Sequence, residues 1–107
     1  VIGHPTGRLI NKRNPYEVDL DKVFQAARDN NVALEVNSHP SRLDLKDAHI
    51  RRAVEIGTKL IINTDSHSTE HLRFIHLGIA QARRGWATEK SVLNTLPLNK
   101  FEKAITR

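Results

Sequence analysis

The sequence contains no cysteine and no methionine, and aromatic residues make up only 5% of it. Without cysteine there are no disulfides and no thiolate ligands, so His, Asp or Glu would have to hold any metal ion. No stretch approaches the roughly 20 consecutive apolar residues of a membrane-spanning helix, and the chain does not open with a signal-peptide pattern. We therefore expect a cytoplasmic protein with no membrane partner.

The length of the chain and its net charge indicate what kind of protein it is. The 107 residues, 38% of them hydrophobic, suffice for one domain with a core and are too apolar for a disordered chain. The formal net charge of +5 suits a polyanionic partner such as nucleic acid and equally suits a solvated surface. Because the chain lacks an initial Met and Val1-Ile2-Gly3 is typical of the end of a buried strand, we expect residues 1–107 to be a fragment of a larger protein.

Three short apolar segments recur at a spacing of about 30 residues, the length of a βαβ unit. They lie at residues 1–2, 32–37 and 59–64, and apolar residues with helical spacing follow each of them. The pattern predicts helices over 19–30, 44–57 and 68–85, and one or two short helices after residue 88. This alternation predicts an α/β fold with a parallel sheet and right-handed crossovers.

The ends of the predicted helices carry recognisable capping residues. Asp19 and Asp44 suit the start of the first two helices, and Ser68 or Thr69 suits the start of a single long third helix. Gly57 and Gly85 are expected to end the second and third helices.

Polar side chains follow all three predicted strands. His4 ends the first, Asn37 to His39 end the second, and Asp65 and His67 follow the third. Because parallel strands end at one edge of the sheet, two imidazoles and a carboxylate can meet there, as a divalent metal ion requires. The alternative, in which Asp65 caps a turn, His67 faces solvent and His4 is a loop residue bonded to backbone, stays open at this stage.

Other charged residues fit more than one role. Arg8 and Arg42 lie in loops at the same edge, where a guanidinium can grip a phosphate or simply form a surface ion pair. Glu35 lies within an apolar strand, which favours an edge-strand or salt-bridged carboxylate over a catalytic one. We expect three further histidines in helices to be exposed and not to bind metal: His49, His71 and His76.

Taken together, these motifs resemble the PHP (polymerase and histidinol phosphatase) family, in the form fused to bacterial and archaeal family X DNA polymerases. The Asp65-x-His67 motif is common to PHP domains generally, whereas the segments around Trp86 and Asn94 are similar to the polymerase-linked branch. The likeness covers almost the whole chain, at Gly3–Arg8, Leu34–Asn37, Arg42–Leu45, Asn63–His67, Ala82–Trp86 and Val92–Thr95.

The resemblance implies a fold, a cofactor and a set of site residues. It implies that residues 1–107 are the C-terminal part of a distorted (βα)7 PHP barrel, whose intact form holds up to three metal ions, Mn²⁺ or Zn²⁺. By motif position His4, Asp65 and His67 would be metal ligands, Asp65 and His67 would serve catalysis, and Arg8 and Arg42 would bind substrate phosphate. The remaining ligands would lie upstream of Val1, so the fragment alone is expected to be inactive.

The resemblance also implies a function and partners. The module would be a metal-dependent phosphoesterase that acts as a 3′–5′ exonuclease or 3′-end-processing enzyme on DNA during DNA repair. Its partners would be DNA, the upstream part of the PHP domain and a polymerase domain of the same chain. Two alternatives stay open: a small-molecule phosphatase of the histidinol-phosphate type, and a non-catalytic module that stabilises the polymerase or holds DNA.

Overall fold

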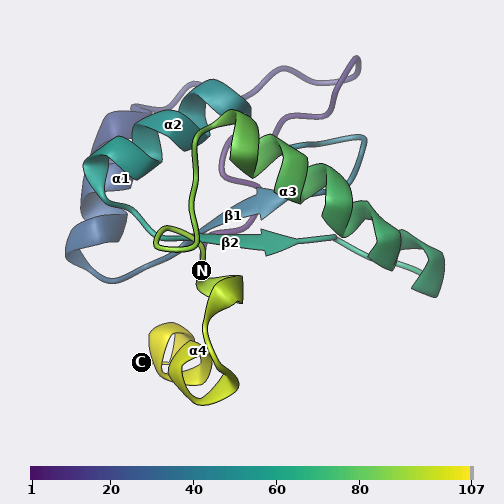
Figure 1. Cartoon of the computed structure of the whole chain (residues 1–107). Coiled ribbons are helices and arrows are strands. Elements are labelled where there is room, and N and C mark those ends of the chain that lie inside the picture. Colours follow the sequence, from purple (N-terminus) through teal and green to yellow (C-terminus); the bar gives the residue numbers. More distant parts are fainter. Residues whose placement is uncertain (107) are drawn as a thin grey trace.

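The computed structural model describes residues 1–106, in which a short parallel sheet lies between two sets of helices (Figure 1). The sheet consists of β1 (Leu34–Asn37) and β2 (Leu60–Asn63). Three helices lie on one side of it: α1 (Leu20–Asp29), α2 (Asp47–Ile56) and α3 (Ile75–Arg84). α4 (Leu98–Ile105) lies on the other side, and 3₁₀ helices η1 (Thr69–Phe74) and η2 (Leu93–Thr95) precede α3 and α4. The α/β class is confirmed.

The sheet is parallel, as predicted, but smaller than three full strands. β1 and β2 pair in register from Leu34 opposite Leu60 to Asn37 opposite Asn63. The predicted first strand is reduced to one parallel bridge between Ile2 and Leu34. It ends there because the backbone of His4 turns into the left-handed region, with φ of 43°. On the far side, Leu60 forms a parallel bridge with Val92.

Successive residues of each strand face opposite sides of the sheet and so join two separate cores. Leu34, Val36, Leu60 and Ile62 belong to the larger core, beneath α1, α2 and α3. Ala33 and Ile61 face the other way and pack with residues of η2 and α4. This second face also carries the polar residues of the strands, and it is the face from which the candidate site is built.

The first helix agrees closely with its sequence pattern. The Asp19 side chain caps α1 by accepting a hydrogen bond from the Lys22 backbone N–H at 3.2 Å. Phe24 and Ala27 are buried against the larger core. The left-handed residue that follows the helix is Asn31, with φ of 54°.

The second helix begins later than predicted, and Asp44, the residue expected to cap it, does not do so. α2 starts at Asp47, and the residue before it, Lys46, makes no side-chain capping bond. Asp44 is instead fully buried and accepts hydrogen bonds from two backbone N–H groups of the first loop. Gly57 ends the helix in the left-handed conformation, φ 94°, as predicted.

The predicted long third helix is divided into two pieces. Residues 69–74 form the 3₁₀ helix η1 and only residues 75–84 are α-helical, and neither Ser68 nor Thr69 caps the start with its side chain. Leu72 of η1 is 59% exposed, so the tighter 3₁₀ turn does not bury it against the sheet. Arg83 and Arg84 occupy the last turn of α3, and Gly85 ends the helix as predicted.

The final segment covers the free edge of β2. The Asn94 side chain bonds to the backbone of Ile62 as a neighbouring strand would. Its oxygen accepts from the Ile62 N–H at 2.8 Å, and its amide donates to the Ile62 carbonyl at 2.9 Å. One or two short helices were predicted here, and the structure has η2 and α4, with Leu93, Leu96 and Phe101 packed on the second face. None of the helices within residues 1–106 is both long and apolar enough to cross a membrane.

Candidate functional site

A polar row crosses the carboxyl end of the sheet on its second face. Glu35 and Asn37 of β1 share this face with Asn63 of β2, since residues two apart in a strand point the same way. Asp65, two residues beyond Asn63, continues the row, and Asn37 donates to its Oδ2 at 3.3 Å. Strand register therefore brings amides and carboxylates together at the edge where catalytic groups of parallel sheets collect.

Glu35 is the buried anchor of this row. Its carboxylate, 7% exposed, accepts hydrogen bonds from the His4 backbone N–H at 2.8 Å and from the amides of Asn63 at 3.1 Å and Asn37 at 3.3 Å. The expectation of an edge-strand or salt-bridged carboxylate is wrong, because β1 has neighbours on both sides and the partners of Glu35 are amide and backbone donors. Glu35 thereby fixes the backbone of His4.

His4 and Asp65 meet across the strand ends. The Nε2 of His4 lies 3.5 Å from the Oδ2 of Asp65. Both residues have left-handed backbones, with φ of 43° and 54°, a conformation that is uncommon for residues other than glycine. Strained backbone at a sheet edge is typical of functional positions, where surrounding bonds hold it in place.

The surroundings of Asp65 favour its charged form. Partial burial opposes ionisation, but the hydrogen bond from Asn37 and the charges of His4, His67 and Arg42 outweigh it and lower the pKa of this carboxyl group. Arg42 contributes through its Nε, 3.6 Å from the Asp65 Oδ2. Asp65 is therefore an anionic oxygen donor at neutral pH, as a divalent cation requires.

The hydrogen bond of His67 determines which of its ring nitrogens can bind a metal. Its Nδ1 lies 2.8 Å from the backbone carbonyl oxygen of Asp65. A carbonyl oxygen only accepts, so Nδ1 carries the hydrogen and the neutral ring has its lone pair on Nε2. Metal-binding histidines commonly have this arrangement, with the second nitrogen donating to a carbonyl or carboxylate.

Two neighbouring histidines have the opposite arrangement. The Nδ1 of His39 accepts from the Ser41 backbone N–H at 3.2 Å, and the Nδ1 of His71 accepts from the His67 N–H at 3.1 Å. In the neutral form each therefore carries its hydrogen on Nε2 and offers no free lone pair there. Contrary to expectation, His71 and His49 are half-buried, whereas His76 is exposed as predicted. His71 packs edge-on to His39, with ring centroids 5.3 Å apart.

The two arginines singled out from the sequence have different surroundings. Arg42 contacts Asp65 and is 18% exposed, so its guanidinium is within the site. Arg8 donates from Nε to the Arg42 carbonyl at 2.7 Å and from Nη2 to the Leu43 carbonyl, which holds the two loops together. Phosphate binding by Arg8 and Arg42 stays a prediction.

Asp44 is a residue whose role sequence reasoning missed. Its Oδ2 accepts from the backbone N–H groups of Thr6 and Gly7, both at 3.0 Å, and the Asp44 carbonyl accepts from the Asn37 N–H at 2.6 Å. These bonds attach the loop after His4 to the loop after β1. No local signal could have revealed this role, since the partners lie far apart in the sequence.

The residues at this edge fit a shared metal site that other groups would complete. Two atoms bound to one tetrahedral ion at about 2.1 Å are themselves roughly 3.4 Å apart. The 3.5 Å between His4 Nε2 and Asp65 Oδ2 matches that spacing, and His67 offers a lone pair nearby. Within residues 1–106, however, no group of three His, Asp or Glu side chains is already arranged around one ion.

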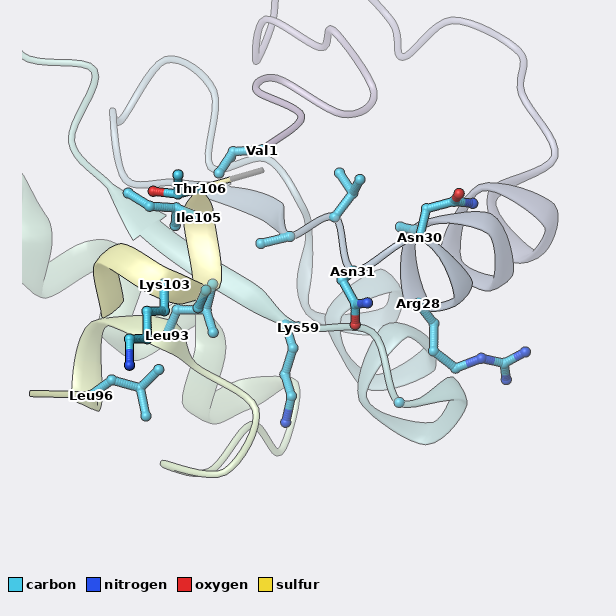
Figure 2. Close-up of a pocket in the computed structure, with 15 residues that line it drawn as sticks. Val1, Arg28, Asn30, Asn31, Lys59, Leu93, Leu96, Lys103, Ile105 and Thr106 are labelled. Carbon is cyan, nitrogen blue, oxygen red and sulfur yellow. The ribbon is translucent and has the colours of Figure 1, made fainter. Parts of the chain in front are cut away.

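One hollow of the described chain lies elsewhere. It has a volume of about 780 Å³ and opens at the amino end of the strands, and its lining includes Lys59 and, from α4, Lys103 (Figure 2). No His, Asp or Glu lines it. Because acid–base and metal chemistry need such groups, this hollow is not the candidate site.

The sequence of the chain is similar to those of two kinds of known protein. Over all 107 residues it is 46% identical to the DNA polymerase/3′-5′ exonuclease PolX of Bacillus subtilis (strain 168), and it spans 19% of that protein. Over 101 residues, 89% of the chain, it is 25% identical to two proteins named as probable phosphatases, from Thermoanaerobacter sp. (strain X514) and Thermoanaerobacter pseudethanolicus. It spans 39% of each of these. No protein-family model matches the chain.

The resemblance to a family X DNA polymerase that the motifs indicated is confirmed by this identity over the whole chain. The similarity to the phosphatases is weaker but covers nearly the same residues. The chain spans about a fifth of the polymerase and well under half of the phosphatases.

Proposed function

We propose that this chain is part of a metal-dependent phosphoesterase module of the PolX kind, which processes DNA 3′ ends as a 3′–5′ exonuclease in DNA repair. The proposal rests on the 3.5 Å distance between the His4 Nε2 and the Asp65 Oδ2. The hydrogen bond of His67 to the Asp65 carbonyl leaves its Nε2 able to bind a metal ion as well. The name of the PolX relative includes 3′-5′ exonuclease, and the weaker relatives are named as phosphatases, so phosphoester cleavage is common to both.

The fold we propose for the complete module is the distorted (βα)7 PHP barrel, of which this chain would be the C-terminal part. The parallel order Ile2, β1, β2, Val92 supports a continuing parallel sheet. The second face of the sheet, with its polar row, would face the barrel interior. The upstream part of that barrel and a polymerase domain would be partners within the same chain.

In this proposal each residue has a defined task. His4 Nε2, Asp65 Oδ2 and His67 Nε2 would hold metal ions, Mn²⁺ or Zn²⁺, up to three in the complete site. When bound, such ions supply a nucleophile from water at neutral pH and neutralise charge on the phosphate. Arg42, already beside Asp65, would position a phosphate oxygen, and Glu35 would hold the His4 backbone in place. Because most ligands would come from outside residues 1–107, we expect this chain alone to cleave no DNA.

Two other functions have specific support. The similarity to the Thermoanaerobacter proteins favours a small-molecule phosphatase, which would release phosphate from monoesters. The formal net charge of +5 suits a non-catalytic module that stabilises the polymerase or holds DNA.

The test is Mn²⁺-dependent digestion of a 3′-labelled DNA strand by the protein at its full encoded length. Wild type is compared with Asp65→Asn, and with Asp29→Asn as a control, because Asp29 is an exposed carboxylate paired with Arg28 far from the site. We expect wild type and the control to release the 3′ label, and Asp65→Asn to be at least about a hundredfold slower because it loses an anionic oxygen donor.

The alternatives give different results in the same assay. Release of phosphate from small monoesters without digestion of DNA would favour the phosphatase. Metal-independent DNA binding without cleavage of either substrate would favour the non-catalytic module and contradict the proposal.

A further inference from the structure

We infer that the loop after His4 and the start of α2 form a second phosphate-binding site, which holds the backbone of the DNA strand next to the candidate site. The inference rests on the proposed function in one respect, since the strand in this site would lead to the His4–Asp65 edge. It goes beyond the proposed function because it names residues outside the metal site that would hold the polynucleotide.

The site is a hollow of about 600 Å³ between the loop and α2. Four cationic residues line it, and its other lining residues are neutral, with no Asp or Glu among them. The cationic residues are Arg8, Lys12, Arg13 and Lys46. Concentrated positive charge in a concave surface without acidic partners is the electrostatic pattern of a phosphate-backbone site.

The loop that carries these cations is held by its own hydrogen bonds. Leu9 and Arg13 form an antiparallel bridge, and the Ile10 N–H donates to the Ser41 carbonyl at 2.7 Å. The Arg13 Nε donates to the Gly7 carbonyl at 2.9 Å, and the Tyr16 hydroxyl donates to the Pro5 carbonyl at 2.9 Å. The hollow is therefore pre-formed, so that binding orders little additional backbone.

The four cations divide into two that hold the structure and two that are free to bind. Arg8 and Arg13 use their guanidinium groups on backbone carbonyls. Lys12 and Lys46 are exposed, and within residues 1–106 neither ammonium group forms a hydrogen bond or ion pair. Asp47, the acid next to Lys46, is instead paired with Arg84 at 3.2 Å. Two unpaired lysines beside a rigid loop can each neutralise one phosphate.

The larger hollow at the opposite edge, shown in Figure 2, does not have this pattern. Its lining includes apolar side chains such as Leu93 and Leu96. Two of its cations are already used: Arg28 pairs with Asp29 at 2.9 Å, and Lys59 donates to the Lys90 carbonyl at 2.6 Å. Among the lining cations within residues 1–106 this leaves Lys103 of α4, which makes α4 a suitable place for control substitutions.

The basic hollow also connects directly to the candidate site. Arg8 lines the hollow and donates to the Arg42 carbonyl, and the Arg42 side chain contacts Asp65. A strand that lies in the hollow would therefore pass Arg42 before it reached the His4–Asp65 edge. A small phosphoester could reach Arg42 but could not span both places.

The experiment compares Lys12→Gln/Lys46→Gln with the control Lys100→Gln/Lys103→Gln in the protein at its full encoded length. Both double variants remove two exposed lysines and the same charge. Binding of a fluorescent single-stranded oligonucleotide is measured without divalent ions between about 0.05 and 0.2 M salt. Hydrolysis of bis(p-nitrophenyl) phosphate with Mn²⁺, a diester with a single phosphate and no strand to lie in the hollow, reports separately on the candidate site.

For Lys12→Gln/Lys46→Gln we expect the dependence of the logarithm of the DNA association constant on the logarithm of the salt concentration to become less steep. The magnitude of the slope should decrease by about 1.4, because each lost contact to a single-strand phosphate contributes about 0.7. At about 0.1 M salt this corresponds to binding that is roughly tenfold or more weaker. The control should bind as wild type does, and both variants should hydrolyse the small diester equally.

Equal oligonucleotide binding by wild type and Lys12→Gln/Lys46→Gln would overturn the inference. So would an equal loss in the Lys100→Gln/Lys103→Gln control, because net charge alone would then account for it. If no protein hydrolyses the small diester or digests DNA, the proposed function fails, while the salt slopes still decide whether the hollow binds DNA.

Discussion

At the scale of single residues, the metal-binding capacity of a histidine depends on which ring nitrogen its hydrogen bonds leave with a lone pair. Sequence analysis found His4, Asp65 and His67 because they follow predicted strands. The Asp65-x-His67 motif favoured His67 over His39, but the free ring nitrogen of each histidine could not be predicted, because three-dimensional hydrogen bonds determine it. Nor could sequence analysis foresee Glu35 as an anchor, because its donors come from three separate segments.

A pH-dependent stability is predicted from His49, which was expected to be exposed but is half-buried in α2. Burial is the main cause that lowers the pKa of His49 below its usual value of 6.5, and the positive charges of Lys46 and Arg8 lower it further. The negative charges of Asp44 and Asp47 raise this pKa but do not outweigh the other effects. Below pH 6.5 the unfolded chain binds a proton that the folded chain does not. The free energy of unfolding should therefore fall as the pH falls from about 7 to 5.

The check is chemical denaturation of wild type and His49→Gln across this range. His49→Gln should have a flatter pH dependence, and His76→Gln, an exposed control, should keep that of wild type. Identical pH profiles for wild type and His49→Gln would show that the burial of His49 does not control its protonation.

At the scale of elements, sequence patterns succeeded where the determining contacts are local. Asp19 and Gly57 were identified correctly because a helix end is specified by neighbours within one turn. Asp44 was misassigned because its partners, Thr6 and Gly7, lie in another loop. The division of the third helix into η1 and α3 has no local signal that we can identify.

The packing of α3 on the sheet predicts an unusual response at Gly78. In a helix, Gly to Ala normally stabilises by about 1 kcal/mol. Here an added Cβ would lie 1.9 Å from the Ser38 Oγ and 2.7 Å from the Ile62 Cγ2, and Ser38 is fully buried. We expect Gly78→Ala to lower the free energy of unfolding by about 1–3 kcal/mol, measured by denaturant titration.

A second substitution tests this cause. Ser38→Ala removes the nearest atom, so Gly78→Ala should cost less in that background than in wild type. If Gly78→Ala alone raises stability, α3 does not approach the sheet as closely as described.

At the scale of the whole chain, the two faces of one sheet have different uses. The larger core under α1, α2 and α3 stabilises the fold, and the opposite face carries the polar row that ends at Asp65. The α/β class and parallel order followed from the spacing of strands and helices. The short length of the sheet did not, because pairing of Ile2 is limited by the turn at His4.

The measurement that tests the metal site most directly is Mn²⁺ binding, by calorimetry, to the protein at its full encoded length. His67→Gln is compared with His39→Gln, because these two histidines both follow strands and differ in which ring nitrogen is free. We predict that His67→Gln weakens Mn²⁺ binding by about tenfold or more, whereas His39→Gln leaves it unchanged. Equal affinities for wild type and His67→Gln would contradict the assignment of His67, together with His4 and Asp65, as metal ligands.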